Sequence, residues 1–416
     1  MAWYIEEQER IYLDYNATTP LEREVENAIA ESMKYWANPS SNSPLGVKAK
    51  EVIEAARDDV AKMMHVNSKE VFFTSGGTET NYWVIHSAIE HFKAIYGREG
   101  KPHIVTSSIE HPSILEPLHW LSQKGELEHT EIGVDPSTGL VKLDDLEAAL
   151  CERTVLVSVM LANNETGVIQ PLSQIADIAR RAGERYDSRV LVHTDAAQAV
   201  GKMDVDPDVL KTDFVTVVGH KFYGPRIGAL VIRSEKTVPL QSLFRGGSQE
   251  HEKRAGTENT PMIAGLGAAC RIVTERLPDF VEHMRDVRDY FEEQLKNALG
   301  DAVVIHFATS QRIPNTSSVS FVKYPGNASD LLSKCKSFFA STGAACHAGT
   351  NRISAVLSAC GILDKVAFRT VRFSFGRDSS RAQVDRVVNE LKSIAFFGKY
   401  GSSLLSAINK GPLPGF

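Results

Sequence analysis

The feature that most constrains the fold of this chain is a series of short segments in which nearly every residue is apolar or β-branched. These segments are 71–74, 103–106, 154–160, 190–193 and 214–218. Runs of this kind are typical of central strands that are buried on both faces of a sheet. Helical stretches lie between several of them. The alternation predicts an α/β fold with a mostly parallel sheet and helices on both sides.

The pattern changes at about Pro261. A long helical region runs to about Leu299, and three strands follow before a terminal helix near 382–394; the strands are 303–307, 317–322 and 371–375. This order is typical of a smaller α+β domain. A chain of 416 residues is also long for one core, so two domains are expected. The tail 397–416 is rich in Gly, Ser and Pro and is predicted to be loosely held. Near the N-terminus, Pro20 is expected to open a helix that runs to about Tyr35.

Composition excludes several classes of protein. The net charge is -6, whereas nucleic-acid and anionic-membrane partners favour a basic surface. No apolar run approaches the roughly 20 residues that span a membrane, and the first residues resemble neither a secretory signal nor a transit peptide. The five cysteines are odd in number and have no CxxC spacing, which argues against a structural zinc site. We therefore expect a cytosolic protein that binds neither membranes nor nucleic acid.

The segment Ser75-Gly76-Gly77-Thr78-Glu79 joins a predicted strand to a predicted helix. Glycines let a backbone approach a ligand closely, and a helix N-terminus offers free N–H groups. Gly77 and Thr78 are therefore candidates to bind a phosphate. The alternative is an ordinary strand–helix turn.

Asp195 ends a predicted buried strand in the segment His193-Thr194-Asp195. A carboxylate at such a place is costly unless a cationic group faces it, and a protonated pyridine nitrogen is one such group. His193 and Asp195 could instead belong to a metal site. No further ligands stand at a recognisable spacing, so we predict no metal.

Lys221 follows the next strand in the segment Val218-Gly219-His220-Lys221-Phe222. A lysine beside a buried strand can lose its solvation, and this lowers its pKa and frees the amine for a Schiff base. The alternative is a surface lysine in a loop. Together with Gly77 and Asp195, however, Lys221 completes the set of groups that a protein supplies to pyridoxal phosphate.

Other candidate residues stand near strands or in loops. His111 follows a strand and could stack on a cofactor ring or cap a helix. Cys346 lies among glycines and small residues beside a histidine, so its thiol is a candidate nucleophile. The other four cysteines fit small buried side chains better. Arg372 alternates with apolar residues on a strand and could hold a carboxylate or form a structural ion pair. Asn16 and Asn164 are turn residues by default.

Together these motifs resemble the cysteine desulfurase and selenocysteine lyase group of the class-V aminotransferase superfamily, which are fold-type-I pyridoxal-phosphate enzymes. The matching segments extend from about Ile11 to about Val388 and include YLDYNATTP, FTSGGTET, EHPSI, LANNETGVIQP, HTDAAQAVGK, GHKFYGPRIGAL and RFSFGR. Within the group the selenocysteine lyases are more similar, through RAGTENTPMIAGLG, HMRDVRDYFEEQL and GAACH. Bacterial desulfurases usually carry Ser where this chain has Val218, so one phosphate contact is expected to be absent or replaced.

The resemblance implies an architecture. It implies a large cofactor-binding domain over residues 16–262, with a sheet of the seven-stranded type. A smaller α+β domain would comprise 1–15 and 263–416 and would carry the Cys346 loop.

The resemblance also implies a role for each matching residue. Lys221 would hold the cofactor as a Schiff base and transfer protons, Asp195 would face the pyridine nitrogen, and His111 would stack on the ring. The remaining cofactor contacts would come from Gly77, Thr78, Asn164, Gln198 and His220, and from Thr257, which would reach the phosphate of a neighbouring subunit in a homodimer. Asn16, Asn164 and Arg372 would bind the substrate carboxylate. Cys346 would meet the leaving selenium or sulfur.

The predicted activity is conversion of L-selenocysteine to L-alanine with release of selenium as selenide, and a selenophosphate synthetase is a possible acceptor. The first alternative is a cysteine desulfurase that acts on L-cysteine and keeps a persulfide on Cys346. The second is a protein that has kept the fold and lost catalysis. That alternative predicts a missing lysine or aspartate, yet Lys221 and Asp195 are both present.

Overall fold

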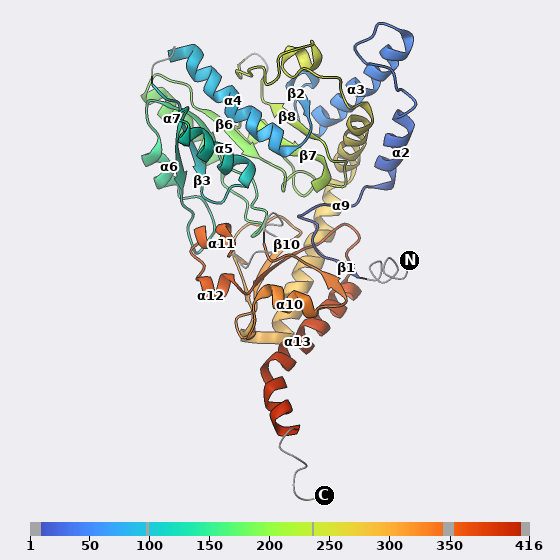
Figure 1. The fold of residues 1–416 in the computed structure, drawn as a ribbon, viewed down its shortest axis with the longest axis vertical. Helices are drawn as coiled ribbons and strands as arrows, with labels where there is room; N and C mark the ends of the chain where they lie inside the picture. The colour runs from blue at the N-terminus through green and yellow to red at the C-terminus, as the bar shows by residue number, and fades with distance from the viewer. Residues whose placement is uncertain (1–9, 97–99, 235–236, 344–352, 409–416) are drawn as a thin grey trace, which may run out of the picture.

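The structure is a computed structural model, and it describes residues 10–96, 100–234, 237–343 and 353–408. Figure 1 shows two layered bodies joined by a long helix, with the larger body formed by the first part of the chain. No helix in the described ranges is long and apolar enough to cross a membrane.

The larger body is built around a seven-stranded sheet with the order β2-β8-β7-β6-β5-β3-β4. Its strands are β2 (Val71–Thr74), β3 (His103–Ser107), β4 (Glu128–Ile132), β5 (Thr154–Ser158), β6 (Leu191–Asp195), β7 (Phe214–Val218) and β8 (Gly228–Ile232). Strands β4, β3, β5, β6 and β7 pair in parallel, and β8 is antiparallel to both β7 and β2. The predicted α/β fold with a mostly parallel sheet is therefore confirmed.

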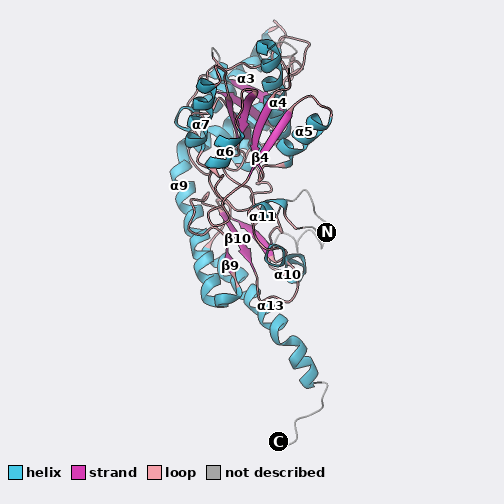
Figure 2. Cartoon of the chain, turned by 90° about the vertical axis from the view of Figure 1, so that its left-hand side faces the viewer, coloured by secondary structure: helices cyan, strands magenta, loops and turns pink. Residues whose placement is uncertain are grey.

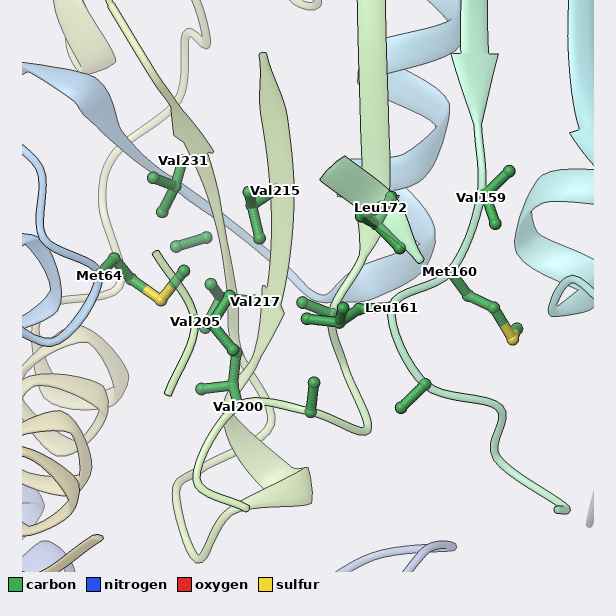
Figure 3. Packing of buried hydrophobic residues seen from close by; sticks show 14 of the residues in the cluster. Met64, Val159, Met160, Leu161, Leu172, Val200, Val205, Val215, Val217 and Val231 are labelled. Carbon is green, nitrogen blue, oxygen red and sulfur yellow. The ribbon is translucent and has the colours of Figure 1, made fainter. Parts of the chain in front are cut away.

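Helices cover both faces of this sheet, as Figure 2 shows from the side. They include α2 (Arg23–Ser32), α3 (Pro44–Met63), α4 (Gly77–Tyr96), α5 (Pro112–Gln123), α6 (Leu143–Ala149), α7 (Leu172–Arg185) and α8 (Pro207–Leu210). Successive strand residues point to opposite faces. Leu156, Leu191 and Phe214 pack with α4 and α5, whereas their neighbours Val157, Val192 and Val215 pack with α3 and α7. Figure 3 shows this second core around Val215, Val217 and Val231.

Helix α2 begins at Arg23, three residues later than Pro20 predicted. The reason lies in the backbone hydrogen bonds of the preceding segment. Thr19 N donates to His220 O and Glu22 N donates to Tyr223 O, so the chain is held extended against the Lys221 loop before the helix starts. The segment that precedes α2 therefore forms one wall of the region around Lys221.

The second body is built around an antiparallel sheet with the order β12-β10-β9. These strands are β9 (Val304–Ile305), β10 (Thr316–Ser320) and β12 (Thr370–Ser374), and β1 (Ile11–Tyr12) pairs in parallel with β11 (Phe338–Phe339) nearby. Its helices are α10 (Ala328–Lys334), α11 (Ala355–Ala359), α12 (Asp364–Ala367) and α13 (Arg381–Ile408). The core here includes Phe291, Val319 and Phe373. Whether the chain divides at residue 262 into folding units stays a prediction.

Two long helices define this part of the chain. Helix α9 (Thr260–Leu299) supplies residues to the cores of both bodies, Leu266 to one and Phe291 to the other. Helix α13 runs to Ile408, so the tail that was predicted to be loosely held is helical over 397–408. Adding residues to an existing helix gains one hydrogen bond each, which outweighs the weak propensity of single glycines.

Candidate active site

A cavity of about 260 Å³ opens at the carboxyl ends of the parallel strands, where α/β sheets usually bind ligands. The walls come from the N-terminus of α4, from loops that follow β5, β6 and β7, and from β12 of the second body. Most of the predicted site residues line it: Asn16, Gly77, Thr78, His111, Asn164, Asp195, Gln198, His220, Lys221 and Arg372. The structure thus brings together residues from both ends of the sequence, such as Asn16 and Arg372.

Gly77 and Thr78 form the first turn of α4 and lie at one end of this cavity. A Cβ atom on Gly77 would lie 2.7 Å from Val218 Cγ2, so glycine is the residue that fits here. The helix has 20 residues, and its N-terminus presents N–H groups and a positive dipole end toward the cavity. An adjoining hollow is lined by Gly77, Val218 and Arg226. Arg226 thus places a cation beside the predicted phosphate position, and this residue was not predicted from the sequence.

Asp195 ends β6, and a helix residue and a backbone amide hold its carboxylate. Its Oδ2 accepts a hydrogen bond from Asn81 Nδ2 at 2.8 Å, and its Oδ1 accepts one from Ala197 N at 2.9 Å. Asn81 is fully buried on α4 and accepts in turn from Thr216 Oγ1 at 2.7 Å. This network fixes the carboxylate at the cavity wall. Asn81 was also missed, although an asparagine one turn after Thr78 on a helix that must face the sheet is a signal for it.

His193 lies on the same strand as Asp195, but the two side chains do not form a metal site in the described part of the chain. Its Nδ1 and Nε2 atoms lie 2.8 Å from Ser158 Oγ and 3.0 Å from Thr216 Oγ1, so both nitrogens have partners. Burial lowers the pKa of His193 to about 4. Among the described residues, one group has metal-ligating atoms within 4.8 Å of one another, namely His119, His129 and Glu131. None of these lines the cavity.

Lys221 ends a short 3₁₀ turn (Gly219–Lys221) directly after β7. Its Nζ donates hydrogen bonds of 2.8 Å to the carbonyl oxygens of Asn16 and Ala17. Its neighbour His220 lies 3.1 Å from Thr18 Oγ1 through Nδ1. Burial, with a smaller contribution from the charge of Lys221, lowers the pKa of His220 to about 4. A neutral imidazole therefore stands beside the lysine, which avoids a second positive charge at this point.

His111 is the N-cap of α5, since its Nδ1 accepts a hydrogen bond of 3.1 Å from Ser113 N. The capping alternative is thus observed. The same side chain also lines the cavity, so capping leaves the ring available to a ligand. Burial lowers the pKa of His111, and Asp195 opposes this shift.

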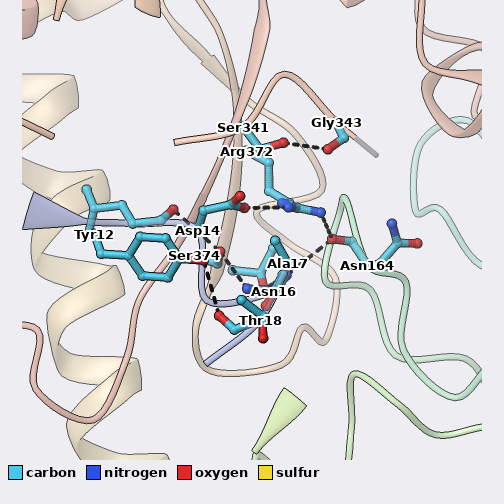
Figure 4. Close-up of polar contacts among 12 residues, drawn as sticks. Tyr12, Asp14, Asn16, Ala17, Thr18, Asn164, Ser341, Gly343, Arg372 and Ser374 are labelled. Carbon is cyan, nitrogen blue, oxygen red and sulfur yellow. Dashed lines mark hydrogen bonds and ion pairs between the residues drawn. The ribbon is translucent and has the colours of Figure 1, made fainter. Parts of the chain in front are cut away.

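Arg372 is buried on β12 between two partners, which Figure 4 shows on either side of its guanidinium group. Its Nη2 forms an ion pair of 2.5 Å with Asp14, and its Nη1 donates to the carbonyl oxygen of Asn164 at 2.9 Å. Its Nε is buried without a partner. An incoming carboxylate would therefore join or displace Asp14. Asn164 contributes its main-chain carbonyl here.

Asn16 lies at the centre of the site, and protein partners occupy all positions of its side-chain amide. Nδ2 donates to Asn164 O at 3.2 Å and to Thr316 Oγ1 at 2.8 Å. Oδ1 accepts from Asn315 Nδ2 at 3.0 Å and from Lys202 Nζ at 3.3 Å. A direct bond from Asn16 to a substrate carboxylate would require one of these partners to leave.

The remaining predicted site residues are Thr257 and Cys346. Thr257 lines a separate hollow with Arg226 and Arg254. Cys346 lies outside the described residues. The last described residues before it are next to the site, because Ser341 pairs with Arg372 through backbone hydrogen bonds of 3.2 and 2.7 Å.

The other four cysteines lie away from the cavity. Cys270, Cys335 and Cys360 are buried, as predicted, and burial raises the pKa of Cys335 and Cys360 to about 12. Cys151 is half-buried, with its Sγ 3.6 Å from His103 Nδ1.

Comparison with known proteins gives consistent results. The family model described as Aminotransferase class-V matches residues 11–387. A selenocysteine lyase of Bos taurus is 45% identical over 407 residues, which is 93% of each chain. The cysteine desulfurase IscS of Dictyoglomus turgidum is 38% identical over 92% of this chain and 96% of its own. A solved NifS-like protein superposes with a TM-score of 0.83 at 33% identity, covering 93% of this chain and 100% of that one.

Proposed function

The chain belongs to the class-V aminotransferase family of pyridoxal-phosphate enzymes, and from this premise we propose that it is a selenocysteine lyase that converts L-selenocysteine to L-alanine. Relatives named selenocysteine lyase at 43–46% identity support this substrate over cysteine, since relatives named cysteine desulfurase share 36–38%. The observation that carries the proposal is the single cavity that joins Lys221, Asp195 and Arg372.

The residues of the cavity fit pyridoxal phosphate. The helix N-terminus at Gly77, where a Cβ atom would collide with Val218, suits a phosphate group. Asp195 is oriented by Asn81 and Ala197 and suits a protonated pyridine nitrogen. Lys221 is the amine that would hold the aldehyde carbon. When bound, the cofactor supplies the electron sink that stabilises a carbanion at Cα of an amino acid.

The chain's own residues would then divide the remaining work. Arg372 would hold the substrate carboxylate, with its unpartnered Nε available in addition to the groups that face Asp14 and Asn164. The amine of Lys221 would take the proton from Cα of the substrate. Thr78, Gln198 and His220 would hold the cofactor oxygens, and His111 would cover the ring.

The selenium step would involve Cys346, and release of the selenium as selenide would require an external reductant. Cleavage of the Cβ–Se bond with a proton delivered to Cβ turns one selenocysteine into one alanine and one atom of selenium in the zero oxidation state. When the product is selenide, two external thiols would supply the two electrons and form one disulfide. Cys346 would meet the selenium as it leaves. On the alternative activity, Cys346 would retain sulfur from L-cysteine as a persulfide.

The proposal includes the protein's setting. A homodimer would bring Thr257 of one subunit to the phosphate bound by the other, and a selenophosphate synthetase would be a suitable acceptor of the selenide. The cytosol is the proposed compartment.

The test is product formation by the cofactor-loaded protein with L-selenocysteine or L-cysteine supplied separately. We expect equimolar alanine and selenium from selenocysteine and little alanine from cysteine. Lys221→Ala should abolish turnover and the absorbance of the bound Schiff base, and Cys346→Ser should abolish selenocysteine turnover. Comparable turnover of both substrates, with persulfide on Cys346, would instead identify a cysteine desulfurase.

A further inference from the structure

Lys202 is a buried lysine behind the active site to which neither the motifs nor the proposed chemistry gives a role. Lys202 is 4% exposed, and it does not line the main cavity. It follows β6 in a tight turn at Gly201, whose φ is +75°. A Cβ atom on Gly201 would lie 2.5 Å from Phe222 Cβ, so this glycine lets the turn pack directly against the loop that carries Lys221.

The amine of Lys202 makes two hydrogen bonds, and both go to neutral amides. Nζ donates to Gln198 Oε1 at 2.8 Å and to Asn16 Oδ1 at 3.3 Å. No carboxylate in the described part of the chain lies within ion-pair distance of it. Burial, with smaller contributions from the charges of Lys221 and Arg372, places the pKa of Lys202 well below its usual range. Burying an amine without a counter-ion costs free energy of folding, so we expect Lys202 to have a role in the site that offsets this cost.

The two amides that Lys202 contacts both belong to the cavity wall. Gln198 Nε2 donates to Asn16 O at 2.9 Å, the same carbonyl oxygen that accepts from Lys221 Nζ at 2.8 Å. The carbonyl end of the Gln198 amide thus faces Lys202, and its NH₂ end faces Asn16. One N–H of that group remains for a ligand in the cavity. Lys202, Gln198, Asn16 and Lys221 therefore form one connected set.

We propose that Lys202 is a positioning residue that holds the side-chain amide of Gln198 in the orientation in which it meets the cofactor and the main-chain carbonyl of Asn16. This inference rests on the proposed function, because it assumes that Gln198 contacts the cofactor. Without the amine, Gln198 Oε1 would be buried without a donor, and such a group turns to find another partner. The cofactor would then lose a fixed contact although no residue that touches it had changed.

The experiment is a double-mutant cycle on cofactor affinity, measured by fluorescence titration of the cofactor-free full-length protein with pyridoxal phosphate. The variants are Lys202→Met, Gln198→Met and the double variant. We expect each single variant to bind about tenfold more weakly than the wild type, the loss of one hydrogen bond. The double variant should bind within twofold of Gln198→Met, because Lys202 acts through Gln198. Lys323→Met, an exposed lysine of the second body, is the matched control and should bind normally.

The outcomes separate the inference from the proposed function. Binding by Lys202→Met within twofold of the wild type, or losses that multiply in the double variant, would overturn the positioning role. If Lys202→Met does not fold, the double variant is compared with Gln198→Met. The double variant removes the Gln198 amide together with its donor Lys202, so it leaves no Gln198 oxygen buried without a hydrogen bond. A tenfold weaker cofactor affinity of the double variant than of Gln198→Met would also overturn the positioning role. A wild-type protein that does not bind pyridoxal phosphate would refute the proposed function and this inference together.

Discussion

Glu110 should make the stability of this protein depend on pH in one definite direction. Its carboxyl group is buried beside the active site, next in sequence to His111. Oε1 accepts hydrogen bonds from Ser107 Oγ and from Met160 N, the latter at 2.9 Å, whereas Oε2 has no partner. Burial, to which the charge of Asp195 adds, raises the pKa of Glu110 to about 8. The perturbation we choose is Glu110→Gln, which keeps both hydrogen bonds to the retained oxygen and removes the titration.

The sign follows from the two pKa values. Below the ordinary pKa of 4.5 the carboxyl is protonated in both the folded and the unfolded states, so it carries no penalty. As the pH rises above that value, the unfolded chain ionises and the folded chain does not, so the wild type loses stability until the pH passes about 8. At 1.36 kcal/mol per pKa unit, the loss between pH 5 and pH 9 is about 4 kcal/mol.

The assay is urea unfolding of the cofactor-loaded wild type and Glu110→Gln at pH 5, 7 and 9. The two proteins should be similar in stability at pH 5, because each has one buried polar group without a partner. Glu110→Gln should become the more stable by several kcal/mol at pH 9. Glu126→Gln, at an exposed glutamate, is the control for general effects of lost charge. A stability difference between wild type and Glu110→Gln that stays constant from pH 5 to pH 9 would contradict a raised pKa of Glu110 in the folded protein.

Three further predictions concern the cavity itself. Asp195→Asn should lower kcat by about 100-fold or more, measured as alanine formation, because a fixed charge at the electron sink is lost; a change below fivefold would contradict this. Arg372→Lys should raise KM by about 10- to 100-fold with a smaller effect on kcat, since a bidentate contact becomes a single one; an unchanged KM would place the substrate carboxylate elsewhere. Gly77→Ala should weaken binding of pyridoxal phosphate, measured by titration, and adding Val218→Ala should recover part of it because the contact at 2.7 Å is relieved.

Much of the site could be predicted because neighbouring parallel strands bring their carboxyl ends to one edge of a sheet. Asp195 is the last residue of β6 and Lys221 follows β7, and these two strands pair directly. Gly77 follows β2 at the start of α4, and each of the three residues stands at a break between an apolar run and a polar segment. Position along the chain therefore translates into position in space for residues at strand ends. Strand β4 was missed because its sequence Glu-His-Thr-Glu-Ile is mostly polar, as an exposed edge strand allows.

The partners of these residues could not be predicted in the same way. Asp14 and Arg372 are 358 positions apart, and nothing in either segment indicates that one pairs with the other. Asn16 looked like a turn residue that could reach a substrate, yet its amide is used entirely by the protein. Lys202 lies seven positions after Asp195 in the segment HTDAAQAVGK, but its burial depends on how closely Gly201 approaches Phe222. Such contacts depend on side-chain direction after the two bodies have packed.

The charges around the cavity explain why these contacts matter together. Lys221 and Arg372 line the cavity and Lys202 does not; the pKa of Lys202 is lowered mainly by burial and further by the charges of Lys221 and Arg372. Arg372 forms an ion pair with Asp14, and Lys221 and Lys202 donate hydrogen bonds to carbonyl and amide oxygens. Positive potential of this kind favours anionic guests, which here means the phosphate of the cofactor and the carboxylate of an amino acid. Each guest therefore stabilises the folded chain as it binds.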